Sequence, residues 1–181
     1  MASMAQDEIR RLSERVKFGM NRAIKRGEIL GNDMLYGYKK DKELGVLNII
    51  EDEAKIVRRI YELYGIEEIS LSKISNILNS EGISSCQNKK WCISTISRMI
   101  ENPKYKGYYC GKKSEVIDYM SKKVKKFCES EWVMYEDSEK IPPIVDEKLF
   151  YLANKRLNEN QKVFSNGNNK NMYPFSSKIE C

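Results

Sequence analysis

The side chains that could do chemistry in this chain are mostly cationic, and they lie in two segments. Residues 10–26 include seven basic side chains and one acidic side chain, and residues 104–126 include eight basic and two acidic ones. Clustered Lys and Arg side chains can bind a row of phosphates, because each contact releases counterions condensed on a polyanion. The two segments therefore predict surfaces for a polyanion, although each could instead be a solvated face that keeps the protein soluble.

Several catalytic and metal-binding classes are excluded because the sequence contains no histidine. Ser-His-Asp and Cys-His catalytic sets and His-containing zinc sites cannot form within this chain. The cysteines are odd in number, irregularly spaced and without a C-x-x-C pair, which is typical of reduced cytosolic thiols. We expect the first four to be small packing residues, and we predict no metal and no cofactor. The five cysteines are Cys86, Cys92, Cys110, Cys128 and Cys181.

Length and composition predict one compact domain. The chain has 181 residues, a formal net charge of +6 and 41% hydrophobic residues, which is enough to bury a core. No stretch approaches the roughly 18 apolar residues that a transmembrane helix needs. Residues 1–6 also lack the apolar core of a secretory signal. We therefore expect a soluble, cytoplasmic protein that makes no contact with a membrane.

The first predicted element is an amphipathic basic helix over residues 5–27. Apolar side chains recur every three or four positions on one side, and four arginines share another face. Gly27 ends the helix, and the stretch 31–37 is predicted to be a loop. Such a helix suits a chain lying along a duplex, but it could also dock on the domain or lie on a membrane surface. The apolar residues are Ile9, Leu12, Val16, Met20 and Ala23, and the arginines are Arg11, Arg15, Arg22 and Arg26.

A strand and a scaffolding helix are predicted next. Residues 46–50 are β-branched and apolar, which indicates a short strand. Residues 51–64 carry apolar side chains at helical spacing, with acidic residues in the first turn that suit the helix dipole. The stripe expected to be buried is Ala54, Val57, Ile60, Tyr61 and Tyr64.

Two shorter helices carry the strongest functional signal. Ser70 or Ser72 can cap a helix that ends near Gly82, and a second helix spans about residues 92–101 before Pro103. The second helix has a polar and basic outer face. This pattern describes a helix-turn-helix, whose second helix reads base edges in the major groove of DNA. The side chains of the second helix expected to point inward are Ile93, Ile96 and Ile100.

The segments 105–113, 115–120, 122–127 and 132–135 predict an antiparallel hairpin or small sheet. It would form a wing beside the second helix, although its lysines could instead protect an edge strand from aggregation. The predicted fold class is therefore α+β, a helix-turn-helix with a small antiparallel β wing, preceded by a long basic helix.

A last helix is predicted to begin after Asp146, and the Ser-Asn-Gly-Asn-Asn run within 164–170 indicates a flexible linker. The residues expected on the core side of this helix are Leu149, Phe150, Leu152, Ala153 and Leu157.

The order of several short motifs resembles that of a known family. The chain reads IRRLSERVKFG at 9–19, YGY at 36–38 and, after Trp91, ISRMIENPKYKG at 96–107; it closes with IPPIVDEKLF at 141–150. Each motif is weak alone, but their order and spacing are specific. Over nearly its whole length the chain resembles the DNA-binding recombinase domain of large serine recombinases, the phage-integrase and transposon-resolvase-like enzymes.

This resemblance implies a division of the chain into three parts. Residues 1–27 would be the end of a helix leaving a catalytic domain, and residues 28–163 would be the DNA-binding domain. Residues 164–181 would be a linker and the start of a zinc ribbon, in which Cys181 is either the first ligand or an incidental cysteine. The nucleophilic serine domain of the family has no counterpart here, so we expect a chain that does not cut DNA, from a parent that is a site-specific recombinase.

The resulting hypothesis is sequence-specific binding of double-stranded DNA at one half of a recombination site. We expect this chain to be a monomer and the parent enzyme to be a tetramer on DNA. The resemblance places the helix from Cys92 in the major groove and residues 31–38 in the minor groove. Phosphates would be bound by Arg11, Arg15, Arg22, Arg26, Lys104, Lys106, Lys112 and Lys113. Base edges or the adjacent backbone would be contacted by Asn88, Lys89, Lys90, Ser94, Thr95 and Arg98, and the minor groove by Asn32, Met34 and Tyr36.

Two other functions are open from the sequence. A winged-helix transcription regulator would be a self-sufficient dimer that binds a palindrome cooperatively. A protein-interaction module would use the basic helix against a partner helix or an acidic surface, and would retard no DNA. RNA is a weaker alternative, because no aromatic pair lies in a recognisable single-strand-binding motif.

Overall fold

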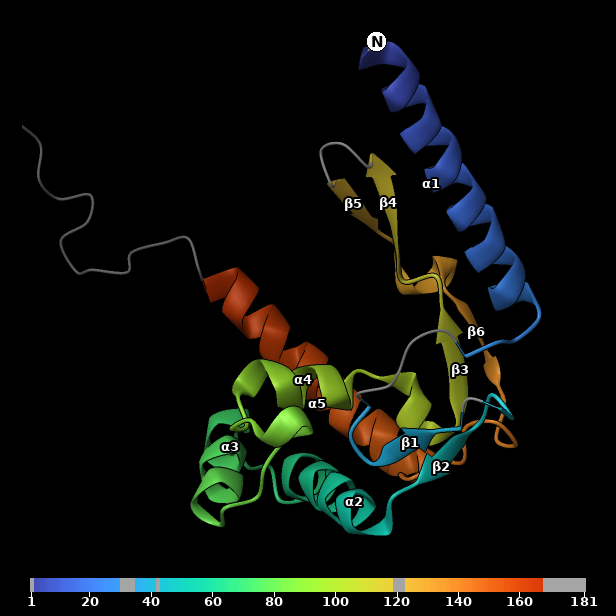
Figure 1. Cartoon of the computed structure of the whole chain (residues 1–181). Helices are drawn as coiled ribbons and strands as arrows, with labels where there is room; N and C mark the ends of the chain where they lie inside the picture. The colour runs from blue at the N-terminus through green and yellow to red at the C-terminus, as the bar shows by residue number, and fades with distance from the viewer. Residues whose placement is uncertain (1, 30–34, 42, 119–122, 168–181) are drawn as a thin grey trace, which may run out of the picture.

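The chain folds into two parts, which Figure 1 shows one above the other. A computed structural model describes residues 2–29, 35–41, 43–118 and 123–167. The lower part, here called the body, consists of β1 (Tyr38–Lys40), β2 (Leu47–Ile49), α2 (Glu51–Gly65), α3 (Leu71–Ser80), α4 (Ile93–Ile100) and α5 (Glu147–Gly167). The upper part, here called the arm, consists of α1 (Ala2–Lys25), β3 (Tyr108–Gly111), β4 (Ser114–Asp118), β5 (Lys123–Lys126) and β6 (Val133–Glu136). The architecture is α+β with small antiparallel sheets, as predicted.

The core of the body forms around α2. Every residue of its predicted stripe is at most 1% exposed, which confirms that the stripe is a buried face. The ring of Tyr61 stacks on that of Phe150 from α5 at 6.2 Å, and the Tyr61 hydroxyl donates to the Met99 carbonyl oxygen at the end of α4. One buried tyrosine therefore contacts two neighbouring helices.

Helices α3 and α4 pack against each other beside α2. Ser70 caps α3 by accepting from the Lys73 amide, and Gly82 takes the left-handed conformation (φ 72°) after the helix, both as predicted. The connection 81–92 contains a short 3₁₀ turn rather than a single tight turn. One expectation for α4 is wrong. Ile93 is 50% exposed and Met99 is buried in its place, because the inner face follows positions 96, 99 and 100.

Among the described residues, three antiparallel strand pairs complete the fold. The strand predicted at 46–50 is β2, and it pairs with β1, which the sequence did not predict. In the arm, β3 pairs with β6 so that Tyr109 lies opposite Tyr135, with their rings stacked at 5.0 Å. Val116 of β4 lies opposite Val124 of β5. The small antiparallel sheet structure predicted for this segment is confirmed.

Helix α5 closes the body against α2. The Asp146 carboxylate accepts from the Lys148 amide at 3.1 Å, which caps the helix as predicted. The guanidinium of Arg156 donates to the Tyr64 and Glu68 carbonyl oxygens, so α5 is bonded to the end of α2. Leu152, however, is 46% exposed and not on the core side. The helix also runs to Gly167, into the predicted linker, whose later residues lie outside those described, as does Cys181.

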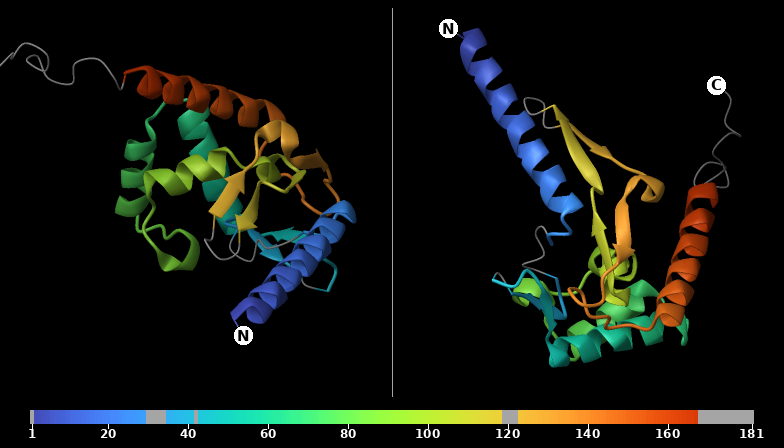
Figure 2. Two further views of the ribbon diagram at one scale, coloured as in Figure 1. Left: turned by 90° about the horizontal axis from the view of Figure 1, so that it is seen from above. Right: turned by 90° about the vertical axis from the view of Figure 1, so that its right-hand side faces the viewer.

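Helix α1 projects from the body alongside β4 and β5, as the views in Figures 1 and 2 show. Its last turn is anchored, since Ala23 and Ile24 are buried and Lys140 Nζ donates to the Gly27 carbonyl oxygen. Helix α1 spans 24 residues, about 36 Å. None of the described helices has the length and apolar character needed to cross a membrane.

The cysteines divide between buried and exposed positions. Cys110 is buried and Cys86 is half-buried, in agreement with packing roles, but Cys92 and Cys128 are exposed, which corrects the expectation for these two. No disulfide joins any of the four described cysteines.

Candidate functional site

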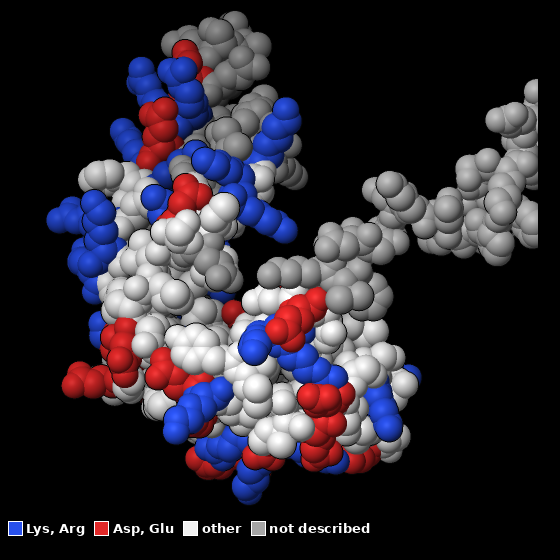
Figure 3. Space-filling view, turned by 180° about the vertical axis from the view of Figure 1, so that it is seen from behind, with Lys and Arg blue, Asp and Glu red and all other residues white. Residues whose placement is uncertain are grey.

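Positive charge is gathered on the arm, whereas the body carries both signs. Figure 3 shows Lys and Arg crowded over the arm and interspersed with Asp and Glu over the body on the face in view. Two body cations are paired locally: Arg59 forms a bidentate pair with Glu81 (2.5 and 2.6 Å), and Lys55 Nζ lies 3.3 Å from Asp52 Oδ1. The larger excess of positive charge, which can attract a polyanion, therefore lies on the arm.

The outer face of α1 presents its arginines to solvent. Arg11, Arg15 and Arg22 are all exposed, and at 3.6 residues per turn they lie on the side opposite Val16 and Met20. Arg26 is exposed too, but its guanidinium is 2.8 Å from Glu28 Oε1. The predicted arginine row thus exists as one face of a helix.

The β4–β5 hairpin and its approach add a second group of lysines. Lys112 is exposed in a left-handed conformation (φ 57°), and Lys113 is half-buried with its amine 4.7 Å from the Trp132 ring centre. Three further exposed lysines lie on β5 and were not among the predicted site residues, although the basic run KKVKKF was a signal for them. They are Lys123, Lys125 and Lys126.

Two of the predicted phosphate ligands are buried instead. Lys104 and Lys106 are 7% and 9% exposed. Lys106 Nζ donates to the Tyr151 hydroxyl at 2.9 Å and lies 3.9 Å from the Tyr108 ring centre. Burial lowers the pKa of Lys104 to about 8, with the nearby Lys113 charge adding to the effect. This burial contradicts the predicted phosphate contacts of the two lysines.

Tyr36 is likewise inside the body and cannot lie in a minor groove. It is 7% exposed, its ring meets the Trp91 ring edge-on at 5.0 Å, and its carbonyl oxygen accepts from the Tyr105 hydroxyl. The same burial raises the pKa of its phenol to about 12. Asn32 and Met34, the other two predicted minor-groove residues, lie outside the described residues.

The remaining predicted residues lie just before α4 or on the helix itself. Asn88, Lys89, Lys90, Ser94 and Arg98 are all exposed.

Thr95 is half-buried at the first turn of α4. Cys92 occupies the position before this helix, and its sulfur lies 3.3 Å from Ser94 Oγ and 3.0 Å from Thr95 Oγ1. Hydrogen bonds from Ser94 and then Thr95 lower the pKa of this thiol to about 7.

A side-chain clamp from α3 fixes where α4 begins. The Trp91 amide donates to Asn79 Oδ1 at 2.8 Å, and Asn79 Nδ2 donates back to the Trp91 carbonyl oxygen at 3.0 Å. Ser75 Oγ donates to the same carbonyl at 2.9 Å. Sequence analysis did not single out these two polar residues. Their contacts orient the exposed face of α4 relative to α3.

Comparison with known proteins places this arrangement in context. Residues 51–160 match the family model described as "Recombinase". A protein of Bacillus subtilis (strain 168) named "Putative DNA recombinase" is 29% identical over 110 residues, which are 58% of this chain and 22% of that protein. This chain therefore spans about a fifth of the length of that relative.

Two solved structures are also similar. They are described as "Crystal Structure of a LSR-DNA Complex" and "Sequence Requirements of the Listeria innocua prophage attP site". Each is 26% identical, matches 90% of this chain and has a TM-score of 0.49. The matches cover 42% and 57% of the two solved chains, respectively.

Proposed function

This chain belongs to the Recombinase family, and we propose that it binds double-stranded DNA as the target-recognition part of a site-specific serine recombinase. The observation that carries the proposal is the sorting of charge between arm and body. The arm presents a face of exposed arginines on α1 and exposed lysines on β5. Duplex DNA carries one phosphate charge per about 1.7 Å of its axis, so the length of α1, about 36 Å, spans many phosphates.

We propose that α3 and α4 act as a helix-turn-helix. Ile96, Met99 and Ile100 bury one side of α4, which leaves Ser94 and Arg98 facing outward. Small side chains let a helix backbone approach the major groove, and a long guanidinium can reach base edges there. The exposed residues 88–90 precede this face and suit the flanking phosphates.

The β4–β5 hairpin would be the wing in this arrangement, and α1 would follow the backbone. The phosphate-binding set becomes Arg11, Arg15, Arg22, Arg26, Lys112, Lys113, Lys123, Lys125 and Lys126. Recognition of one recombination half-site by a monomer, and cleavage by a serine supplied outside these residues, complete the proposal.

The test is binding of the chain to random-sequence duplex and to a randomised-site library over a salt series. We expect affinity to fall steeply with salt, by about 0.9 in log–log slope per phosphate contacted, and selection to enrich a motif of roughly one helical turn. Binding without enrichment would reject half-site reading by this chain. Absence of binding at low salt would reject DNA recognition altogether.

A further inference from the structure

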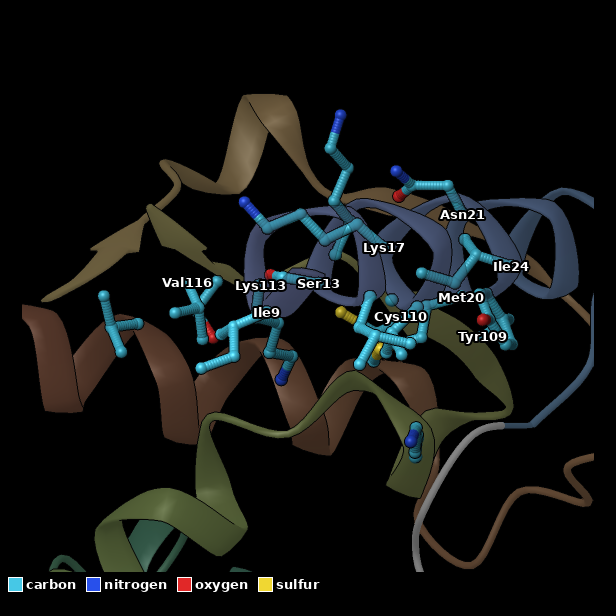
Figure 4. Close-up of a pocket in the computed structure, with 17 residues that line it drawn as sticks. Ile9, Ser13, Lys17, Met20, Asn21, Ile24, Tyr109, Cys110, Lys113 and Val116 are labelled. Carbon is cyan, nitrogen blue, oxygen red and sulfur yellow. The ribbon is translucent and has the colours of Figure 1, made fainter. Parts of the chain in front are cut away.

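A groove of about 710 Å³ lies between α1 and the strands of the arm (Figure 4). Its α1 wall is formed by a stripe of apolar side chains, and its other wall comes from β3, β4 and β5. The surface inside it is predominantly apolar. Apolar residues that line it are Leu12, Val16, Met20, Tyr109, Val116 and Val124.

The apolar walls of this groove are open to solvent. Leu12, Val16 and Met20 are 53%, 59% and 52% exposed, and Val124 on the facing strand is 54% exposed. Single exposed apolar residues are ordinary, but a contiguous exposed set on two facing elements is typical of an interaction site. The groove therefore has the character of an unfilled interface.

The charged side chains among the described residues that line the groove all have one sign. Lys17 from α1 and Lys112 and Lys113 from the strand side line it, and the deeply placed Lys104 does so too. None of the described residues that line the groove is acidic. An occupant that fills the groove must therefore combine apolar side chains with negative charge.

We propose that this groove docks an acidic amphipathic helix of a partner protein. Such a helix lays apolar side chains spaced i, i+3, i+4 and i+7 into a hydrophobic groove, and its flanking carboxylates would meet Lys112 and Lys113. A DNA backbone has the charge but no apolar side chains to bury. A second copy of α1 has the apolar stripe but carries the same excess of positive charge as the groove, which opposes its entry.

The apolar lining of the docking site is separate from the proposed DNA-binding face, although Lys112 and Lys113 border both. The groove residues Val16 and Met20 lie on the side of α1 opposite Arg11 and Arg22, so one helix can serve both ligands. Failure of DNA binding would leave this inference untouched, because its test contains no DNA in the first step.

The probe is a fluorescein-labelled peptide of about four helical turns, with Leu at the spacing above and Glu at most other positions. One control peptide has the same composition in scrambled order, and the other has Lys in place of Glu. We expect the full chain to bind the amphipathic acidic peptide about tenfold or more tightly than either control at about 0.15 M salt.

Matched variants place one carboxylate on either side of α1. Val16→Glu and Val124→Glu should each weaken peptide binding about tenfold, because they put charge into the apolar wall. Phe18→Glu makes the same charge change on the arginine side, where Phe18 is 70% exposed, and should leave the peptide affinity unchanged. All three positions are more than half exposed, so unfolding midpoints should match that of the native sequence.

Three outcomes would overturn the proposal. Equal binding of the scrambled acidic peptide would show that charge alone, and not the apolar walls of the groove, accounts for peptide binding. A loss of duplex affinity as large in Val16→Glu as in Phe18→Glu would show that the groove faces DNA. A dimer seen by sedimentation of the native chain, and lost in Val16→Glu, would make a second copy the occupant.

Discussion

The body and the arm use the same kinds of residue in opposite ways. Ile60 in the body is 0% exposed and Val16 in the arm is 59% exposed, although both lie in apolar stripes at helical spacing. Arg59 of the body is held by Glu81, whereas Arg11 and Arg15 of the arm are exposed. The body thus buries its apolar stripe and pairs its arginine, while the arm leaves apolar and cationic groups exposed.

The border between the two parts runs through one basic segment. By sequence Lys104 belongs with Lys112 and Lys113, but it is buried where the arm joins the body. A lysine that is buried to this extent lowers stability when it is charged and makes stability depend on pH, rather than adding to a phosphate-binding surface. The contrast between body and arm is therefore a contrast of burial, which charge counting does not detect.

The largest expected effect is a test of where stability comes from. Ile60→Ala should lower the free energy of unfolding by about 2–5 kcal/mol, because it opens a cavity in a fully buried core. Val16→Ala removes apolar atoms from an exposed site and should change it by less than about 0.5 kcal/mol. Urea unfolding measures both. Equal losses would break the contrast between body and arm.

Next in size is the effect of the buried amine at the border. The pKa of Lys104 is lowered to about 8, so between there and its ordinary value near 10.5 the unfolded chain binds more protons than the folded chain. Stability therefore rises with pH across that window, and below it the buried charge costs on the order of 3 kcal/mol. Lys104→Met should raise stability at about pH 7, with a gain that shrinks towards pH 10.

Urea unfolding at several pH values up to about 10 checks this, since ionisation of the tyrosines whose pKa is raised in the fold, such as Tyr36, destabilises the fold above that range. Lys155→Met, on the exposed side of α5, is the control and should show no such gain. A Met variant that is less stable at pH 7 would mean that contacts of the amine outweigh its burial.

A smaller effect should distinguish base reading from phosphate binding in the body. Arg98→Ala should cost about 1–3 kcal/mol on the selected DNA site and much less on random duplex, if its guanidinium reaches a base edge. Arg59→Ala removes the same charge from α2 and should leave both affinities unchanged. Competition anisotropy measures the ratio, and an equal loss on both duplexes would reassign Arg98 to the backbone.

The smallest effect belongs to one arginine of the arm. Arg15→Gln should weaken binding to all duplexes alike and reduce the salt slope by about 0.9, because one phosphate contact is lost. The slope is read from affinities measured over a salt series. An unchanged slope would exclude Arg15 from the interface and assign the phosphate contacts to the remaining cations.

Much of the body could be predicted because its signals are local. The stripe of α2, the Ser70 cap and the left-handed Gly82 each depend on a few neighbouring residues, and all three are confirmed. Short elements were harder: β1 has only three residues, and it exists because β2 pairs with it. On α4, the spacing three and four apart fits both Ile93 and Met99, so periodicity could not decide which is buried.

The residue types of the candidate site could be predicted from the sequence, but the burial of its side chains could not. The arginines of α1 are exposed as an amphipathic pattern predicts, yet nothing local shows that Tyr36 fills the space beside Trp91. The aromatic surroundings that bury Lys106 come from β3 and α5, far apart in sequence. Burial of a charged side chain is a property of the assembled fold, so sequence alone assigned Lys106 to the surface.

The hydrogen bonds between α5 and the end of α2 join segments that are synthesised far apart in time. Arg156 and its partner Tyr64 are 92 residues apart, and α2 finds its main neighbour only in the last described helix. Contacts so distant in sequence form slowly. Until α5 has been synthesised, the apolar inner faces of α2 and α4 remain exposed to solvent and can associate with other chains. A chain truncated before residue 147 should therefore leave these faces exposed and be prone to aggregation.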